Sequence, residues 1–317
     1  MIMRAAPDRL ELHVSYDCRN RCVFCSEACR LARFRGKNPT QREIVAILRA
    51  KRSAGFRHVT FTGGEPSLLP YLPRVLAAAR AMGYLTCLTT NGEAFANPRY
   101  AAQNLAALDE LILSVHGADS STHDALTRTP GSFARTAAAL ANISALAGGR
   151  FFLITNTLAV KSNFTLLPGV LDWLGNFGAV KQFLVSYPAP EGRAAADYGR
   201  LAPDLREFSE MAPRLCGVAA RRKKIIRFFG VPACALGAAA GYSNDFHWSP
   251  RLTVERGLRG GVLGFREVLS GAPVRKRFYP AACAGCRFMG LCGGVFKLSG
   301  SARPGWRVTA RQNGAAA

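Results

Sequence analysis

The sequence lacks two features that would place a protein in or across a membrane. Its 317 residues contain no run of eighteen or more apolar side chains, so no membrane-spanning helix is expected. The first ten residues also lack the apolar stretch of a secretory signal, and we therefore expect a cytoplasmic protein. In that reducing compartment ten cysteines argue against a disulfide framework, because clustered cysteines there are more often metal ligands or catalytic groups.

Negative charge is also scarce. The chain has 20 Asp and Glu against 42 Lys and Arg, of which only eight are Lys, and its net charge is +22. Residues 201–317 hold 19 basic and 6 acidic residues, a net of +13, whereas residues 1–200 hold 23 and 14, a net of +9. A basic C-terminal third attracts phosphates, nucleic acid or an acidic partner, or it is simply an Arg-rich surface in contact with water.

Strand and helix patterns alternate over the first 200 residues. Short segments with β-branched and aromatic residues predict strands at 10–16, 57–62, 85–89, 110–115, 151–158 and 182–187. Helical spacing predicts helices between them at 40–54, 71–82, 98–107, 132–147 and 166–176. This alternation predicts right-handed βαβ units, a parallel sheet and an α/β domain over residues 1–200.

The pattern changes beyond residue 200. A helix is expected over about 203–222, interrupted or bent at Pro213, and a strand over 225–231 leads to Cys234. Residues 235–275 are rich in Gly and carry no clear period, and 311–317 are expected to form a frayed tail. Residues 201–317 are therefore predicted to form a smaller α+β, cysteine-rich extension.

Three cysteines directly follow the first predicted strand. Cys18, Cys22 and Cys25 lie within eight residues, so their thiolates can converge on one metal centre. A four-iron cluster held by three cysteines keeps one iron open to a substrate or cofactor. A structural zinc ion usually has four ligands, and Cys29 would supply the fourth, so this segment alone leaves both readings open.

The spacing resembles that of the radical S-adenosylmethionine (SAM) superfamily. Three residues separate Cys18 from Cys22, two separate Cys22 from Cys25, and the aromatic Phe24 stands just before the last cysteine. The resemblance implies a partial (β/α)6 barrel with a 4Fe-4S cluster on these three cysteines. It also implies that the open iron chelates the amino and carboxylate groups of SAM.

A glycine-rich motif follows the second predicted strand and extends the resemblance. Gly63, Gly64, Glu65 and Pro66 match the motif that, by resemblance, holds the methionine amino group of SAM. Glycines allow a close approach of the backbone, and Glu65 offers a carboxylate to an ammonium group. The tetrapeptide alone is a weak signal, but forty residues after the cysteine loop at a strand end it is a strong one.

Further strand ends carry polar residues that match the same family. Thr90 and Asn91 end the third strand, and Ser114 ends the fourth, where the resemblance implies contact with the ribose hydroxyls of SAM. Asn156 on the fifth strand is a candidate for a ribose or carboxylate contact, and Tyr187 ends the sixth strand near the expected adenine site. For Asn156 and Tyr187, ordinary strand-end hydrogen bonding or packing is an equal alternative.

Two histidines follow the fourth strand. Histidine titrates near neutral pH, which suits acid–base chemistry. His116 lies in the loop itself, whereas His123 lies near a predicted helix start, where we expect a capping or surface role.

A second cysteine set lies near the C-terminus. Cys283, Cys286 and Cys292 form a C-x2-C-x5-C pattern, and Cys234 is placed to return as a fourth ligand. The pattern resembles the SPASM and twitch extensions of the superfamily, and the cysteine count allows one auxiliary iron–sulfur cluster. A zinc knuckle on the same ligands is the alternative. Cys87 lies on a predicted strand and is expected to be a buried structural cysteine.

The expected reaction is the one that the resemblance implies. A reduced cluster, supplied by a donor such as flavodoxin or ferredoxin, cleaves SAM, and the 5′-deoxyadenosyl radical abstracts hydrogen from a substrate. The substrate is expected to be a peptide or a small, anionic metabolite, and the outcome an oxidation or rearrangement. The alternative is a zinc-stabilised nucleic-acid-binding protein without radical chemistry, which explains the charge but not the strand-end motifs.

Overall fold

The computed structural model describes residues 7–149, 151–271 and 277–297. The tail expected at 311–317 lies outside the described residues. No helix within the described ranges is long and apolar enough to cross a membrane.

Seven parallel strands form an arc in chain order. They are β1 (Arg9–Ser15), β2 (His58–Gly63), β3 (Leu85–Thr90), β4 (Glu110–Ser114), β5 (Phe152–Leu158), β6 (Val180–Ser186) and β7 (Ile225–Phe229). Each strand pairs in parallel with the next along the sheet. The expected parallel α/β fold is therefore confirmed, and all six predicted barrel strands are present.

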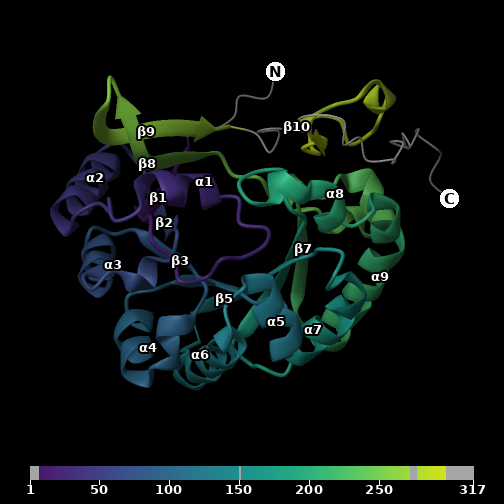
Figure 1. Cartoon of the computed structure of the whole chain (residues 1–317), viewed down its shortest axis with the longest axis horizontal. Coiled ribbons are helices and arrows are strands. Elements are labelled where there is room, and N and C mark those ends of the chain that lie inside the picture. Colours follow the sequence, from purple (N-terminus) through teal and green to yellow (C-terminus); the bar gives the residue numbers. More distant parts are fainter. Residues whose placement is uncertain (1–6, 150, 272–276, 298–317) are drawn as a thin grey trace.

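Helices cover the outside of this arc (Figure 1). The outer layer consists of α2 (Gln41–Ser53), α3 (Leu72–Ala81), α4 (Pro98–Leu105), α6 (Ser132–Leu146), α7 (Leu167–Leu174) and α9 (Leu205–Arg221). Three shorter helices, α1 (Ala28–Phe34), α5 (Ser120–Thr127) and α8 (Tyr198–Leu201), lie in the loops after β1, β4 and β6. The start of α2 is fixed by a capping box, because Thr40 and Glu43 exchange side-chain and backbone hydrogen bonds.

The alternation of side chains along the strands separates the core from the barrel lumen. In β1, Leu10, Leu12 and Val14 are buried in the main hydrophobic core, whereas Glu11 and His13 line cavities on the other face. This is the period of two that any strand imposes, because successive side chains point to opposite faces. The outward face therefore stabilises the fold, and the inward face is free to carry polar, functional residues.

Three strands beyond residue 200 continue the same sheet. The predicted strand at 225–231 is β7, which pairs with β6, while β8 (Arg251–Arg259) pairs in parallel with β1 and forms a hairpin with β9 (Val262–Ser270). The last two strands lie in the segment that showed no period in the sequence. The sheet thus crosses residue 200, and the domain boundary expected there stays a prediction.

Helix α9 runs without interruption through Pro213, contrary to one of the two outcomes expected there. Its buried face carries large apolar residues such as Phe208, Met211 and Leu215. Packing of that face against the core outweighs the one backbone hydrogen bond that a proline removes.

A small second sheet lies at the C-terminal end of the described chain. It contains two short antiparallel strands, β10 (Arg277–Phe278) and β11 (Val295–Phe296), and the cysteines at 283–292 lie in the loop between them. In Figure 1 this segment lies near α8, and Arg277 of β10 lies 5.8 Å from the ring centroid of Phe229 at the end of β7. The extension thus brings the second cysteine set close to the end of β7.

Candidate active site

The first cysteine set lies in the loop between β1 and α1. Its three thiols line one cavity, which we call the lumen cavity, and which contains about 2030 Å³ including its open mouth. Each parallel strand from β1 to β7 contributes to this cavity. Most predicted site residues also line it: Cys18, Cys22, Phe24, Cys25, Gly63, Gly64, Thr90, Asn91, Ser114, Asn156 and Tyr187. The structure therefore brings together residues that are up to 169 positions apart in the sequence.

Backbone contacts from distant segments hold the cysteine loop in place. The N–H groups of Arg21 and Val23 each donate to the end of α5 at 2.9 Å. On the other side, the Arg193 guanidinium donates to the Cys22 carbonyl at 2.6 Å, and the Arg193 N–H donates to the Cys25 carbonyl at 2.9 Å. No sequence pattern pointed to Arg193, because its partners are about 170 residues away.

The electrostatics of the loop suit a metal cluster. Burial raises the pKa of Cys18 and Cys22 to about 12, and the neighbouring thiols add to the effect. A cationic cluster offsets this cost, because it stabilises the thiolate form directly. Within the described ranges no three cysteine, histidine or carboxylate side chains converge on a single ion. Three thiols around one shared space fit a cluster better, since each ligand then meets a different iron.

The two glycines of the glycine-rich motif are required by contact with the segment before Cys18. A Cβ on Gly63, whose φ is +129°, would lie 2.3 Å from the Ser15 carbonyl oxygen, and one on Gly64 would lie 2.4 Å from that of Asp17. The Gly64 N–H donates to Ser15 at 2.7 Å. The close backbone approach that we predicted therefore exists, and it joins β2 to the start of the cysteine loop.

Glu65 and Pro66 lie behind the cavity wall and do not line the lumen cavity. Glu65 is only 2% exposed, and burial raises the pKa of its carboxyl. Its carboxylate accepts hydrogen bonds from the Ser67 N–H at 2.9 Å, the Thr90 hydroxyl at 2.6 Å and the Asn91 N–H at 2.7 Å. Three of about four acceptor positions are thus occupied, and the carboxylate fixes Thr90 and Asn91 at the wall.

Three other predicted residues of the cavity wall make contacts of their own. Asn156 accepts a hydrogen bond from the Ser186 hydroxyl at 2.7 Å, which orients its amide. The Tyr187 hydroxyl donates to the Pro203 carbonyl at 2.9 Å, so the protein itself supplies the acceptor for this hydroxyl. Phe24 packs edge-on against His116, with ring centroids 4.6 Å apart.

His123 is buried, and the expected capping or surface role is wrong. It is 1% exposed, lines the lumen cavity and accepts a hydrogen bond from the His116 N–H through Nδ1 at 3.2 Å. The N-cap of α5 is Asp119 instead. Burial lowers the pKa of His123 to about 4 and lowers that of His116 as well, so both rings are neutral near pH 7.

Ionisable residues that we did not predict also line the lumen cavity. His58 and Glu110 approach within 3.3 Å across β2 and β4, and Glu11 and Arg251 lie beside them on β1 and β8. Cys87 is buried as expected, but it also lines the lumen. The alternation of side chains along each strand could have indicated these residues, because all of them occupy positions that face the lumen.

Comparison with known proteins decides the family. A family model described as the Radical SAM superfamily matches residues 12–173, which is about half of the chain and contains the whole cysteine loop. The chain belongs to the radical SAM superfamily. Membership implies a 4Fe-4S cluster and SAM.

Two curated relatives of this radical SAM enzyme show the breadth of the superfamily. The chain is 28% identical over 131 residues to an S-adenosylmethionine-dependent nucleotide dehydratase of Flammeovirga pacifica, covering 39% of this chain and 43% of the relative. It is 26% identical over 205 residues to a PqqA peptide cyclase of Methylorubrum populi, covering 65% and 52%. The chain thus spans about half the length of the curated relatives it matches.

Solved structures share the radical SAM fold with this chain. SuiB of Streptococcus suis bound to S-adenosylmethionine has a TM-score of 0.59 at 16% identity, covering 78% of this chain and 58% of that one. The enzyme anSMEcpe, solved with AdoMet and the Kp18Cys peptide, has a TM-score of 0.52 at 15% identity, covering 69% and 64%. At these identities the likeness shows the fold alone.

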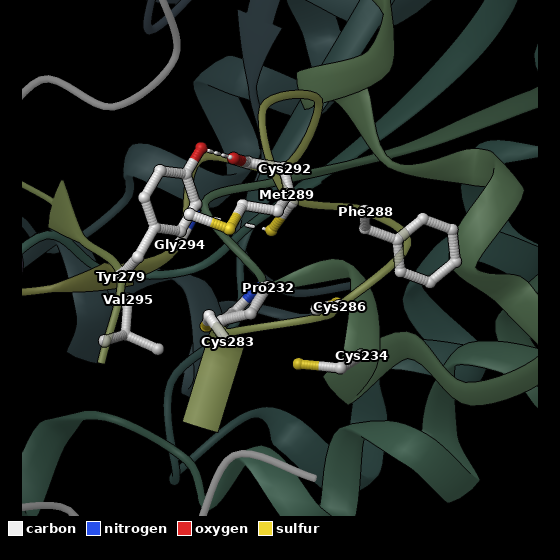
Figure 2. Close-up of a pocket in the computed structure, with 10 residues that line it drawn as sticks. All are labelled: Pro232, Cys234, Tyr279, Cys283, Cys286, Phe288, Met289, Cys292, Gly294 and Val295. Carbon is white, nitrogen blue, oxygen red and sulfur yellow. Dashed lines mark hydrogen bonds between the residues drawn. The ribbon is translucent and has the colours of Figure 1, made fainter. Parts of the chain in front are cut away.

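The second cysteine set of this radical SAM enzyme surrounds a small cavity (Figure 2). Cys234, Cys283, Cys286 and Cys292 line it together with apolar side chains, and it contains about 320 Å³. The N–H groups of Ala233 and Gly294 both point at the Cys292 sulfur, at 3.4 and 3.3 Å. The structure thus gathers the four cysteines that the sequence proposed as one ligand set.

A buried ion pair holds the loop of the second set. The Arg277 guanidinium donates to Asp245 at 2.7 Å, and the Gly293 N–H donates to the same carboxylate at 2.8 Å. The remaining cysteines lie elsewhere: Cys29 is exposed on α1, and Cys216 packs against the main core.

Proposed function

We propose that this chain is a radical SAM peptide maturase, with its cluster on Cys18, Cys22 and Cys25. These three cysteines would hold a 4Fe-4S cluster, which when bound would supply the electron for reductive cleavage of SAM and so the radical chemistry that removes hydrogen from the substrate. The observation that carries the proposal is the gathering of these thiols and the strand-end motifs around one lumen cavity. A small iron–sulfur or flavin protein such as ferredoxin or flavodoxin is the proposed electron donor.

The protein residues of the cavity wall would position the cofactor. Ser114 and Asn156 face the lumen, where a hydroxyl and an amide suit the ribose hydroxyls. Thr90 and Asn91, fixed by Glu65, form the wall beside Gly63 and meet the methionine end. The backbone around Tyr187 lies at the end of β6 and is proposed to receive the adenine, while Phe24 closes the wall beside the cysteines.

The peptide substrate is supported by what the relatives act on. One is a PqqA peptide cyclase, and SuiB has been solved with the precursor peptide SuiA. A small metabolite is the second candidate, because another relative is a nucleotide dehydratase. The alternative of a zinc-stabilised nucleic-acid-binding protein does not account for the family match over residues 12–173.

The second cysteine set is proposed to hold an auxiliary 4Fe-4S cluster, which makes residues 201–317 a twitch-like, SPASM-related domain. Four thiols leave every iron closed, and N–H groups directed at a ligand sulfur are typical of sites that tune a reduction potential. Cys234, Cys283, Cys286 and Cys292 would hold this cluster, and a closed cluster would supply electron transfer rather than substrate chelation. A zinc knuckle on the same four cysteines is the alternative, and metal analysis distinguishes it from an iron–sulfur cluster.

Formation of 5′-deoxyadenosine tests the central proposal. Anaerobically reconstituted protein with dithionite should cleave SAM, and the Cys18→Ala/Cys22→Ala/Cys25→Ala variant should not, because the cluster loses its thiolate ligands. Cys29→Ala is the matched control, since this exposed thiol lies close by in sequence but outside the lumen cavity. Cleavage that persists in the triple variant contradicts the assignment.

A further inference from the structure

Arg193 is attached to two of the three cysteines that are proposed to hold the first cluster, and its positive charge has no role in the chemistry described above. It lies in the segment that follows β6. Its guanidinium donates to the Cys22 carbonyl at 2.6 Å, and its N–H donates to the Cys25 carbonyl at 2.9 Å. A short hydrogen bond from a charged donor is among the stronger ones in proteins. The side chain is therefore held in a defined place beside the cysteine loop.

The backbone just before Arg193 is in direct contact with the same loop. Gly192 has a φ of +56°, and a Cβ at this position would overlap the carbonyl oxygens of Cys25 and Ser26. Glycine is the residue that allows both this conformation and this close approach. Backbone contact therefore fixes the segment against the cysteine loop, whatever side chain stands at position 193.

The charge of Arg193 is not balanced by a carboxylate. Within the part of the chain that the structure describes, its guanidinium forms no ion pair. By contrast, Arg30 pairs with Glu27, and Arg256 pairs with Glu43. Residues 18–26 of the cysteine loop contain two further arginines and no carboxylate. A partly buried cation without a counter-ion is favourable where another negative charge lies close by.

The proposed cluster would supply that negative charge. A four-iron core held by three thiolates is an anion, and its reduction adds one more negative charge. The reduction potential of such a cluster depends on the net charge around it and on the hydrogen bonds near its ligands. A fixed cation beside the ligand loop therefore favours the reduced form over the oxidised form.

Arg193 does not reach the space in which SAM and the substrate are proposed to bind. Cys18, Cys22 and Cys25 line the lumen cavity, but Arg193 is not part of its wall. Its effect on the reaction therefore passes through the cysteine loop.

We propose that Arg193 is a positioning residue whose charge raises the reduction potential of the first cluster and so favours reduction by the electron donor. The proposal rests on the proposed function, because it requires a 4Fe-4S cluster on Cys18, Cys22 and Cys25. It distinguishes the charge of the side chain from its shape, since the backbone of residues 192 and 193 holds the loop independently.

A redox titration of the anaerobically reconstituted full chain, followed by electron paramagnetic resonance, tests this proposal. The signal of the first cluster is the one that is absent from the Cys18→Ala/Cys22→Ala/Cys25→Ala variant. In Arg193→Gln the ratio of reduced to oxidised first cluster at a given potential should fall about tenfold, which is about 59 mV for a one-electron couple. Arg193→Lys keeps the charge but not the guanidinium shape, and its ratio should stay within about threefold of the wild type.

Arg200→Gln is the matched control. It also removes one positive charge from the chain after β6, but Arg200 is almost fully exposed and lies 3.9 Å from an exposed Asp197. Water and salt screen such a charge, so this variant should keep the ratio of the wild type. Iron content and circular dichroism report loading and folding, and the resonance signal counts only loaded molecules.

Three results overturn the proposal. The ratio is unchanged in Arg193→Gln, or it falls equally in Arg193→Lys, which would assign the effect to shape instead of charge, or it falls equally in Arg200→Gln. Each of these results leaves the first cluster itself in place. If the wild type shows no cluster signal that the triple cysteine variant lacks, the proposed function fails, and the role of Arg193 fails with it.

Discussion

The two cysteine sites of this chain differ in how they are enclosed. The first offers three thiols on the wall of a large, open lumen, and its loop is held by contacts from α5 and from Arg193 after β6. The second offers four thiols around a small cavity, and a buried ion pair holds its loop. An open site with a missing ligand suits a reaction, whereas a closed site suits structure or electron transfer.

Removal of the second cysteine site is expected to show the largest difference between the two cysteine sites. The Cys283→Ala/Cys286→Ala variant should lose about four of about eight irons per chain and most substrate turnover. Binding of SAM and much of its uncoupled cleavage should persist, because the lumen cavity is untouched. Iron and zinc analysis beside 5′-deoxyadenosine formation measures this.

The triple variant of Cys18, Cys22 and Cys25 provides the reciprocal measurement. It should keep about four irons in the second site. Zinc without iron in that variant would show that the second site is a structural knuckle and that the proposed electron transfer is wrong.

The buried ion pair of the second site gives the next largest effect. Asp245→Asn keeps the shape of the side chain but leaves the charge of Arg277 buried and unpaired, and both side chains are almost fully buried. We expect a loss of about 3–5 kcal/mol in the free energy of unfolding, measured by denaturant titration. Asp197→Asn, in an exposed pair with Arg200, is the matched control and should change little. Equal stability of the two variants contradicts the structural role of Asp245.

Substitution of Glu65 tests whether SAM binding at the first site depends on how Thr90 and Asn91 are fixed. Glu65→Ala leaves the Thr90 hydroxyl and the Asn91 N–H without their buried acceptor. The affinity for SAM should fall by about tenfold or more, as charged hydrogen bonds contribute about 1.5–3 kcal/mol each. Ser114→Ala removes one neutral hydroxyl and should weaken SAM by about two- to tenfold. Unchanged affinity in both variants shows that the cofactor lies elsewhere.

The smallest expected difference between the sites is in their pH dependence. His13, beside the first site, has its pKa raised above 6.5, because hydrogen bonding and charge from Glu11, Glu27 and Glu255 outweigh the cost of burial. A raised pKa gives stability that is complete below about pH 6.5 and is lost as pH rises through the folded-state pKa. The ion pair of the second site, Arg277 with Asp245, contains no histidine.

Urea titrations between pH 6 and 9 measure that difference. The wild type should lose stability as pH rises, and His13→Asn should lose this slope. Asp245→Asn should keep it. A slope that survives in His13→Asn assigns the dependence to another group.

Much of the fold and the first site were predictable because their signals are local. Alternation within β1–β6 and the spacing of Cys18, Cys22 and Cys25 are properties of short segments, and the ends of parallel strands always meet at one edge. The hairpin of β8 and β9 was not predictable, because its strands carry arginines and glycines and are stabilised by long-range pairing of β8 with β1 and by pairing of β9 with β8. His123 was misplaced for the same reason, since contacts across the chain bury it.

The sequence by itself determined which residues are candidates for the chemistry: two cysteine sets, a glycine-rich turn and polar strand ends. Only the tertiary structure decided what each residue contacts. In the fold, the Glu65 carboxylate accepts the hydrogen bonds that fix Thr90 and Asn91. Trp248 and Arg251 line the same cavity as His13, although more than 230 positions separate them from it in the sequence. Such contacts depend on how the sheet closes on itself, and no short segment of the chain encodes that closure.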